Sequence, residues 1–223
     1  MTGRLARQVL SSRIVALSAL SALLASSACR GSAPVLGAVN TAPKGGGTVV
    51  AAKANTADVQ FMSGMIPHHA QAVLIAGWAE SHGARPDIVR LCERIVVGQR
   101  DEIGLMQTWL RTKGAPVPDA NATHMKMTMN GMEHDMLMPG MLSPEQLADL
   151  DAARGSKFDR LFLQAMIRHH QGAISMVDEL LGSEGAAQDD LVYKFASDVY
   201  ADQTTEISFM QKMLATIPPE GSR

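Results

Sequence analysis

Apolar residues recur at helical spacing in two pairs of segments that lie about a hundred residues apart in the chain. The segments cover residues 55–83, 86–112, 156–182 and 188–216. Asn55 and Asp58 open the first segment, and Ser156 and Asp159 open its counterpart, in the manner of helix N-termini. Pro86 suits the first turn of the second segment. The pattern predicts an all-α fold.

The two halves of the chain repeat one another. The window FMSGMIPHHAQAVLIA at 61–76 aligns with FLQAMIRHHQGAISMV at 162–177 at a shift of 101 residues. Further along, QRDEIGLMQTWL at 99–110 aligns with QTTEISFMQKML at 203–214 at a shift of 104. The duplicated unit is therefore a whole helical hairpin, with repeats at 55–112 and 156–216. Two such hairpins predict an antiparallel four-helix bundle over residues 55–216.

Two further segments complete the predicted organisation. Residues 113–142 hold several Gly and Pro and are expected to form a Met-rich connecting loop. The sequence Ser-Pro-Glu-Gln at 143–146 is a capping-box arrangement that predicts a short helix.

The N-terminal residues 1–28 have the pattern of a secretory signal peptide. Three Arg precede a 12-residue apolar run at 14–25, which small residues follow. Cys29 stands where a lipoprotein cysteine would, whereas Ser26 departs from the Leu preferred before such a site, so lipidation stays open. Residues 29–54, rich in Gly, Ala, Pro and Ser, are expected to form a flexible linker. The prediction is an exported protein, either periplasmic or anchored outside the cytoplasm as a lipoprotein.

Composition supports the helical prediction and argues against a nucleic-acid partner and against a disulfide. Aromatic residues make up only 4% of the chain while Met occurs 15 times, which favours a helical core over a sheet. The net charge is −2 and Lys and Arg form no cluster, which argues against a nucleic-acid partner. Besides Cys29 the chain has only Cys92, which we interpret as a buried apolar residue rather than half of a disulfide.

The repeated histidine pairs are the first candidate site. At about 100° per residue, the first histidine of each pair falls on the inward stripe of its helix and the second on the shoulder of that stripe. Gln99, Gln203 and a neighbouring Glu in each half face the same interior. The candidate metal ligands in the bundle are His68, His69, His169, His170, Met62, Met65, Met106, Met166, Met210, Glu102 and Glu206. Two alternatives stay open, namely a purely structural layer in which His68 and His169 hydrogen-bond these amides and carboxylates, and proton-transfer catalysis.

Met residues at helical spacing more often fill a core than bind a metal. The two halves differ at Pro67, because Arg168 stands at the matching position of the second half. A proline inside a helix removes a backbone hydrogen bond and bends the helix. Pro67 is therefore expected to kink its helix, and a site opened in one half only is the alternative.

The second candidate site is the run HMKMTMNGMEHDMLMPGM at 124–141, with seven Met and two His in 18 residues. Its interleaved polar residues predict neither a helical nor a strand stripe, so core packing does not explain it. Thioethers and imidazoles together are a ligand set that favours Cu(I). The candidate ligands are His124, Met125, Met127, Met129, Met132, His134, Met136, Met138 and Met141. A hydrophobic flap and a partner-docking surface are the alternatives.

These motifs resemble the bacterial family called domain of unknown function 305. Its M-I-x-H-H motif is matched by MIPHHAQA at 65–72 and MIRHHQGA at 166–173, and its Q-x-x-E-I-x-x-M signature is matched at 99–106 and 203–210. The resemblance covers about residues 55–216 and implies a ferritin-like bundle outside the cytoplasm, with copper binding and copper tolerance in some members. A ferritin-type di-iron site is not expected, because the chain has no Glu-x-x-His motif.

The hypothesis is an exported, non-enzymatic protein that sequesters or passes on copper, with Cu(I) favoured and Ag(I) and Cu(II) also considered. Its partners would be the metal ion and other copper-handling proteins, with no nucleic acid, and with a membrane only through a lipid on Cys29. The alternatives are a metal-dependent redox enzyme of ferritin-like fold and a partner-binding bundle without metal.

Overall fold

A computed structural model describes residues 54–129 and 132–218. Within these ranges the chain forms five helices and one pair of strands: α1 (Thr56–Ala76), α2 (Pro86–Thr112), β1 (Met125–Met129), β2 (Met132–Met136), α3 (Pro144–Ala152), α4 (Gly155–Gly182) and α5 (Asp190–Ala215). The all-α expectation is confirmed for the body of the protein. The predicted signal peptide, including Cys29, and the linker up to residue 53 lie outside the described residues.

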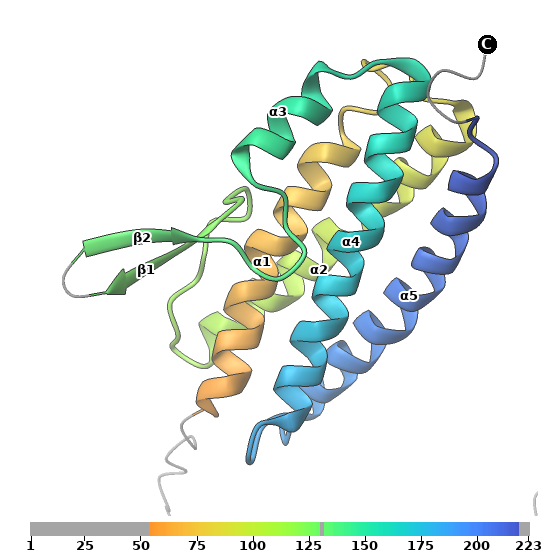
Figure 1. The fold of residues 1–223 in the computed structure, drawn as a ribbon. Helices are drawn as coiled ribbons and strands as arrows, with labels where there is room; N and C mark the ends of the chain where they lie inside the picture. Colours follow the sequence, from red (N-terminus) through yellow and green to blue (C-terminus); the bar gives the residue numbers. More distant parts are fainter. Residues whose placement is uncertain (1–53, 130–131, 219–223) are drawn as a thin grey trace, which may run out of the picture. The chain divides into compact units, whose positions relative to one another are not determined.

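Helices α1 and α2 form one packed hairpin, and α4 and α5 form the other. The two hairpins meet through α1 and α4, which lie side by side in Figure 1, while α3 packs on α4. The β1–β2 hairpin projects from the side of the helices (Figure 1). None of the helices in the described ranges has a stretch both apolar and long enough to span a bilayer.

The predicted helix boundaries hold for α2, α3 and the start of α1, and fail in two places. Helix α1 ends at Ala76 rather than near Gly83, because the N–H groups of Trp78 and Ala79 bond the carbonyls three residues back and the chain continues as turns. Helix α4 begins at Gly155, and Arg154 is its N-cap without a side-chain hydrogen bond, so Ser156 does not cap it. Ser143 forms the expected capping box with Gln146.

The paired acids Asp58 and Asp159 tie the two halves together. The Asp58 carboxylate accepts a hydrogen bond of 2.7 Å from the backbone N–H of Ala187, just before α5. The Asp159 carboxylate accepts one of 3.2 Å from the backbone N–H of Arg85, at the N-cap of α2. Each half therefore fixes the start of the second helix in the other half, and the sequence repeat becomes a structural one.

The Met-rich run forms a hairpin, which corrects the expectation of a loop without strand character. Strands β1 and β2 are antiparallel and pair Met125 with Met136, Met127 with His134, and Met129 with Met132. The sequences Met-Lys-Met-Thr-Met and Met-Glu-His-Asp-Met alternate with period two, which is the period of a strand.

The interior has two apolar clusters with the histidine pairs at their boundary. One cluster takes α1 residues up to Ala70 and α4 residues from Ala173 onward. The other takes α1 residues from Ala72 and α4 residues up to Met166, and it contains the buried free Cys92, as predicted. Pro67 lies inside α1 without ending that helix.

Candidate metal centre

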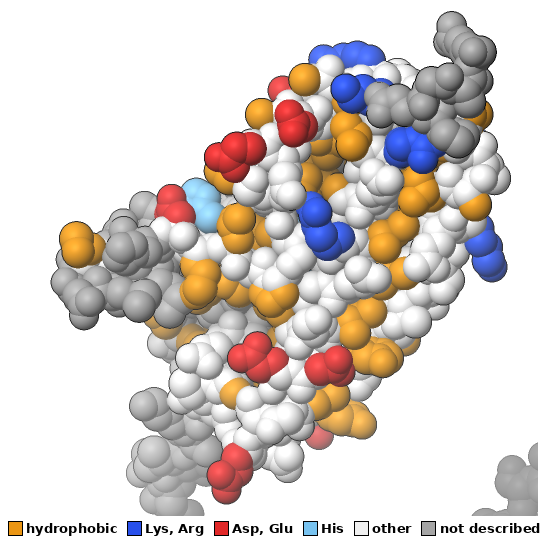
Figure 2. All heavy atoms as spheres, viewed as in Figure 1, with side chains coloured by type: hydrophobic (Ala, Val, Ile, Leu, Met, Phe, Trp, Pro, Cys, Tyr) orange, Lys and Arg blue, Asp and Glu red, His pale blue; other side chains and the backbone are white. Residues whose placement is uncertain are grey.

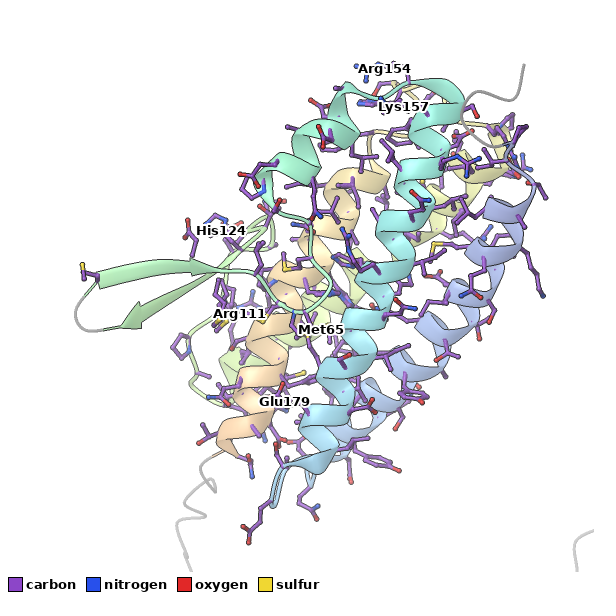
Figure 3. The ribbon with its side chains drawn as sticks, viewed as in Figure 1. Met65, Arg111, His124, Arg154, Lys157 and Glu179 are labelled. Carbon is purple, nitrogen blue, oxygen red and sulfur yellow. The ribbon has the colours of Figure 1, made fainter. Side chains whose placement is uncertain are left out.

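The four repeated histidines lie at the centre of the protein with no exposed surface. The rings of His68 on α1 and His169 on α4 face each other, with centroids 3.8 Å apart and planes inclined by 40°. The close packing of α1 on α4 produces this contact. Met65, one turn before His68, lies at mid-length between the same two helices (Figure 3).

The second histidine of each pair is held by a carboxylate from the neighbouring helix. His69 Nε2 lies 2.7 Å from Glu102 Oε2 on α2, and His170 Nε2 lies 2.7 Å from Glu206 Oε2 on α5. The structural alternative had His68 or His169 hydrogen-bonding these carboxylates. That assignment is wrong, because each glutamate contacts the second ring of its pair, which lies on the shoulder of the inward stripe and faces the neighbouring helix.

Five imidazole nitrogens are buried without a hydrogen-bond partner among the described residues: Nδ1 of His68, His69, His169 and His170, and Nε2 of His169. A carboxylate on Nε2 selects the tautomer that leaves Nδ1 as a free acceptor. His68 Nε2 donates to the Pro139 carbonyl over 3.0 Å, which likewise leaves its Nδ1 as a free acceptor. Each unpaired buried polar atom costs about 1–3 kcal/mol of folding stability, so this cluster destabilises the fold unless a bound group pairs with these nitrogens.

The central imidazoles stay neutral over the ordinary pH range. The pKa of His68 falls to about 3, chiefly because burial disfavours the charged ring and secondly because His69 is close, while the Pro139 carbonyl raises it in part. Burial likewise holds the pKa of His169 well below 6.5, with His68 as the next cause. A neutral imidazole is the form that binds a metal.

Residues 138–142, which we call the strap, cross the outside of α1 and α4 at the level of the imidazoles. Gln71 holds the strap from α1: its amide donates to the Leu142 carbonyl over 3.0 Å and accepts from the Leu142 N–H over 2.7 Å. Gly172 on α4 lets it approach, because a Cβ there would overlap the carbonyl of Pro139. Neither residue was predicted from the sequence. The available signal is that Gln71 and Gly172 occupy matching positions of the repeat and are different residues.

A methionine-lined cleft of about 310 Å³ lies between the hairpin, the strap, α1 and α4. Met125, Met136 and Met138, all predicted candidates, line this cleft. Met176 on α4 joins them and was not among the candidates. From its helical spacing, Met176 was interpreted only as a core residue. The cleft that it lines is formed partly by the strap, whose position helical spacing does not predict.

The other predicted residues do not all join these sites. Met62, Met65 and Met106 pack in one apolar cluster and Met166 and Met210 in the other, all fully buried. Met141 belongs to the strap, is buried, and its sulfur accepts a hydrogen bond from the Met138 N–H over 3.2 Å. Met132 is 62% exposed, and His124 at the base of the hairpin lies 3.3 Å from Asp135 (Figure 3). The side chains of Met127, Met129 and His134 lie outside the described part of the structure.

A second cleft of about 390 Å³ opens between α2 and α5, where Glu102 and Glu206 meet Asp202. The pKa of Asp202 is raised, first by partial burial and then by the negative charges of Glu102 and its neighbours. Gln99 and Gln203 line the same cleft, and neither carbonyl oxygen has a described partner. Over the described residues, no three His, Cys, Asp or Glu side chains are disposed to hold a metal ion.

Comparison with known proteins relates the chain to one family and to solved structures. Residues 58–214 match the family described as Domain of unknown function (DUF305). A DUF305 protein of Streptomyces coelicolor is 26% identical, with 71% of this chain and 92% of that chain covered and a TM-score of 0.60. CopM in its Cu(I)-bound form is 28% identical, with 71% and 95% covered and a TM-score of 0.53.

CopM is similar to this chain in Cu(II)-bound and Ag-bound forms as well. Protein L153 of Acanthamoeba polyphaga mimivirus is 36% identical over 53 residues, which are 24% of this chain. The match spans about a third of that relative, 35% of its length.

Proposed function

This chain belongs to the DUF305 family, and we propose that it is an exported protein that binds copper, chiefly Cu(I), for sequestration or trafficking. Export is argued from the charged and apolar pattern of residues 1–28, and lipidation of Cys29 would anchor the protein to a membrane. The proposed scaffold is an antiparallel four-helix bundle of ferritin-like type. We infer a non-enzymatic role, with other copper-handling proteins as exchange partners.

The observation that carries this proposal is the set of buried imidazole nitrogens without partners. Ligand histidines commonly donate their other ring nitrogen to a carboxylate or a carbonyl, which fixes the ring and raises its basicity. His69 and His170 have this arrangement with carboxylates, and His68 has it with a carbonyl. Their Nδ1 atoms, which have no partner among the described residues, are therefore held in fixed orientations.

The ligand types favour copper over harder or borderline metals. No three His, Cys, Asp or Glu side chains converge to hold a metal among the described residues, and thioether sulfur is proposed to complete the ligand set. Thioether beside imidazole selects Cu(I). Met65 and Met166, one turn before the central histidines, are the proposed sulfur neighbours in the bundle, and the Met-rich hairpin is proposed to capture the ion. CopM, seen with Cu(I), Cu(II) and Ag, supports this class of cargo by similarity.

The proposal is tested by titrating the purified chain with Cu(I), Ag(I), Cu(II) and Zn(II), with native mass spectrometry for stoichiometry and a competing chelator for affinity. His169→Gln should weaken Cu(I) binding while helicity, followed by circular dichroism, is retained. His82→Gln is the matched control, because His82 is also buried but its ring nitrogens contact Ser81 and Asp151.

Failure of the wild-type protein to retain Cu(I) against a weak chelator would overturn the proposal. Equal Cu(I) affinity in the His169→Gln variant and the wild type would remove the imidazoles from the site. Oxygen or peroxide turnover by the copper-loaded protein would instead support the redox-enzyme alternative.

A further inference from the structure

Resting on the proposed function, we infer that Cu(I) binds in the methionine-lined cleft beside the strap and that Met176 is one of its ligands. Met176 belongs to helix α4 and stands outside the Met-rich run, so it joins the hairpin residues only in the folded protein. This thioether site is separate from the imidazole layer, which lies behind the strap.

The lining of the cleft suits a soft monovalent cation. Four thioethers come from four segments: Met125 from β1, Met136 from β2, Met138 from the strap and Met176 from α4. The remaining lining residues are mostly apolar or small, with Glu179 on α4 as the one carboxylate among the described lining (Figure 3). A cleft rich in sulfur and poor in oxygen and nitrogen ligands favours Cu(I) or Ag(I) over Zn(II), Mg(II) or Ca(II).

Met138 and Met176 converge above Gly64 on α1. The Met138 sulfur lies 3.0 Å from the point that a Cβ of residue 64 would occupy, and the Met176 methyl carbon lies 3.4 Å from the same point. Glycine at 64 therefore provides the room in which these two side chains meet. An alanine would press on the sulfur.

The sequence repeat does not duplicate this room. At the shift of 101 residues, Gly64 aligns with Ala165 and Met176 aligns with Ile75. The histidine pairs are duplicated, but the glycine and the methionine that make the thioether site are not. The combination of Gly64 and Met176 is therefore not repeated in the other half of the sequence.

The strap fixes Met138 over this cleft before any ion arrives. Gln71 clamps Leu142 with two hydrogen bonds, and Gly172 admits Pro139 against α4. The Met138 N–H donates to the Met141 sulfur, which anchors the strap from inside. Ligands held in place by such surroundings lose less conformational entropy when they bind.

Exposure decreases from the hairpin toward the cleft floor. Met132 is 62% exposed and Met136 is 38% exposed, whereas Met176 is 7% exposed. Apolar side chains gather on the surface where the hairpin meets the helices (Figure 2). An ion captured on the outer thioethers therefore reaches Met176 last, in the least hydrated part of the site.

Met176→Leu in the full chain tests this inference, with Met213→Leu as its matched control. Leucine keeps most of the volume and removes the sulfur, and Met213 is similarly buried, at 6% exposure, but packs in the other apolar cluster. We expect Met176→Leu to weaken Cu(I) by more than about tenfold, because loss of even an outer-shell partner costs about 10–100-fold in metal affinity. Met213→Leu should bind as the wild type does.

Ag(I) titration of protein labelled at its methionine methyl groups gives an independent readout by NMR. The Met176 and Met138 methyl signals should shift with the first equivalent while the Met213 signal stays in place. Wild-type Cu(I) affinity in Met176→Leu, or equal losses in both Leu variants, would overturn the thioether site and leave the proposed function standing. Absence of Cu(I) binding by the wild type would overturn both.

Discussion

The imidazole of His68 packs on the imidazole of His169 with ring centroids 3.8 Å apart, and these two residues occupy equivalent positions in the sequence repeat. Two like groups meet here because α1 and α4 pack across the interface between the hairpins. The other histidine of each pair turns instead toward a glutamate on the second helix of its own hairpin. Each repeated motif therefore supplies one inner ring and one carboxylate-bound ring.

The metal-free protein should lose stability as the pH falls. The pKa of His68 is lowered from 6.5 to about 3, and that of His169 is lowered as well. Between pH 6.5 and about 3 the unfolded chain takes up a proton at His68 that the folded protein does not, and the lowered pKa of His169 acts in the same direction, so acid favours unfolding. The stabilisation is complete above about pH 6.5 and declines steadily toward pH 3.

Urea unfolding of the metal-free protein at several pH values across this window measures the effect. His169→Gln removes one of the two groups and should make the dependence of unfolding free energy on pH shallower. An unchanged slope in that variant would show that His169 binds a proton as readily in the folded protein as in the unfolded chain.

Gly172→Ala should destabilise the protein and displace the strap. The new Cβ would overlap the Pro139 carbonyl, and relief of overpacking of this kind typically costs about 1–3 kcal/mol. Gly98→Ala on α2 is the control, since nothing lies within 4 Å of the added methyl group. That control should stabilise by about 0.5–1 kcal/mol, because alanine is the better helix residue. Denaturant unfolding measures the stability change in both variants. Equal changes in unfolding free energy would contradict the close approach of the strap.

Asp58→Ala should cost about 1–3 kcal/mol, because the backbone N–H of Ala187 would lose its buried acceptor. Asp101→Ala provides the comparison, since Asp101 is an exposed acid on α2. Hydrogen exchange at the Ala187 amide should accelerate in the Asp58 variant only. Slow exchange at that amide in Asp58→Ala would mean that another group protects it.

Glu102→Gln should weaken Cu(I) binding at the imidazole layer by about 10–100-fold if His69 is a ligand, because the carboxylate orients and polarises that ring. Glu93→Gln, an exposed change on the same helix, should leave Cu(I) affinity unaltered. Competition with a chromophoric Cu(I) chelator measures both. The thioether cleft should keep its affinity in the Glu102 variant, since Glu102 lines the other cleft.

Repetition of the His-His and Gln-x-x-Glu motifs was enough to predict the paired helical hairpins and the buried histidines. Period and capping signals are local, so they indicated where α2 and α3 begin. The strand alternation of the Met-rich run is equally local, and the prediction that the run has no strand stripe was wrong, since Met recurs at every second position of 125–129. Ser156 failed as a cap because Gly155, with φ of +55°, already turns the chain into α4.

Residue type and spacing along a helix are properties of the chain, so the kinds of candidate ligand and their twofold repetition could be predicted without a structure. Which groups meet depends on the folded arrangement: Glu102 with His69, His68 with His169, and Met176 with Met138. These encounters join residues 33 to 101 positions apart, and they depend on how helices pack and where the strap crosses. Spacing fixes the face on which a residue lies, whereas the partner on that face is fixed by packing between elements.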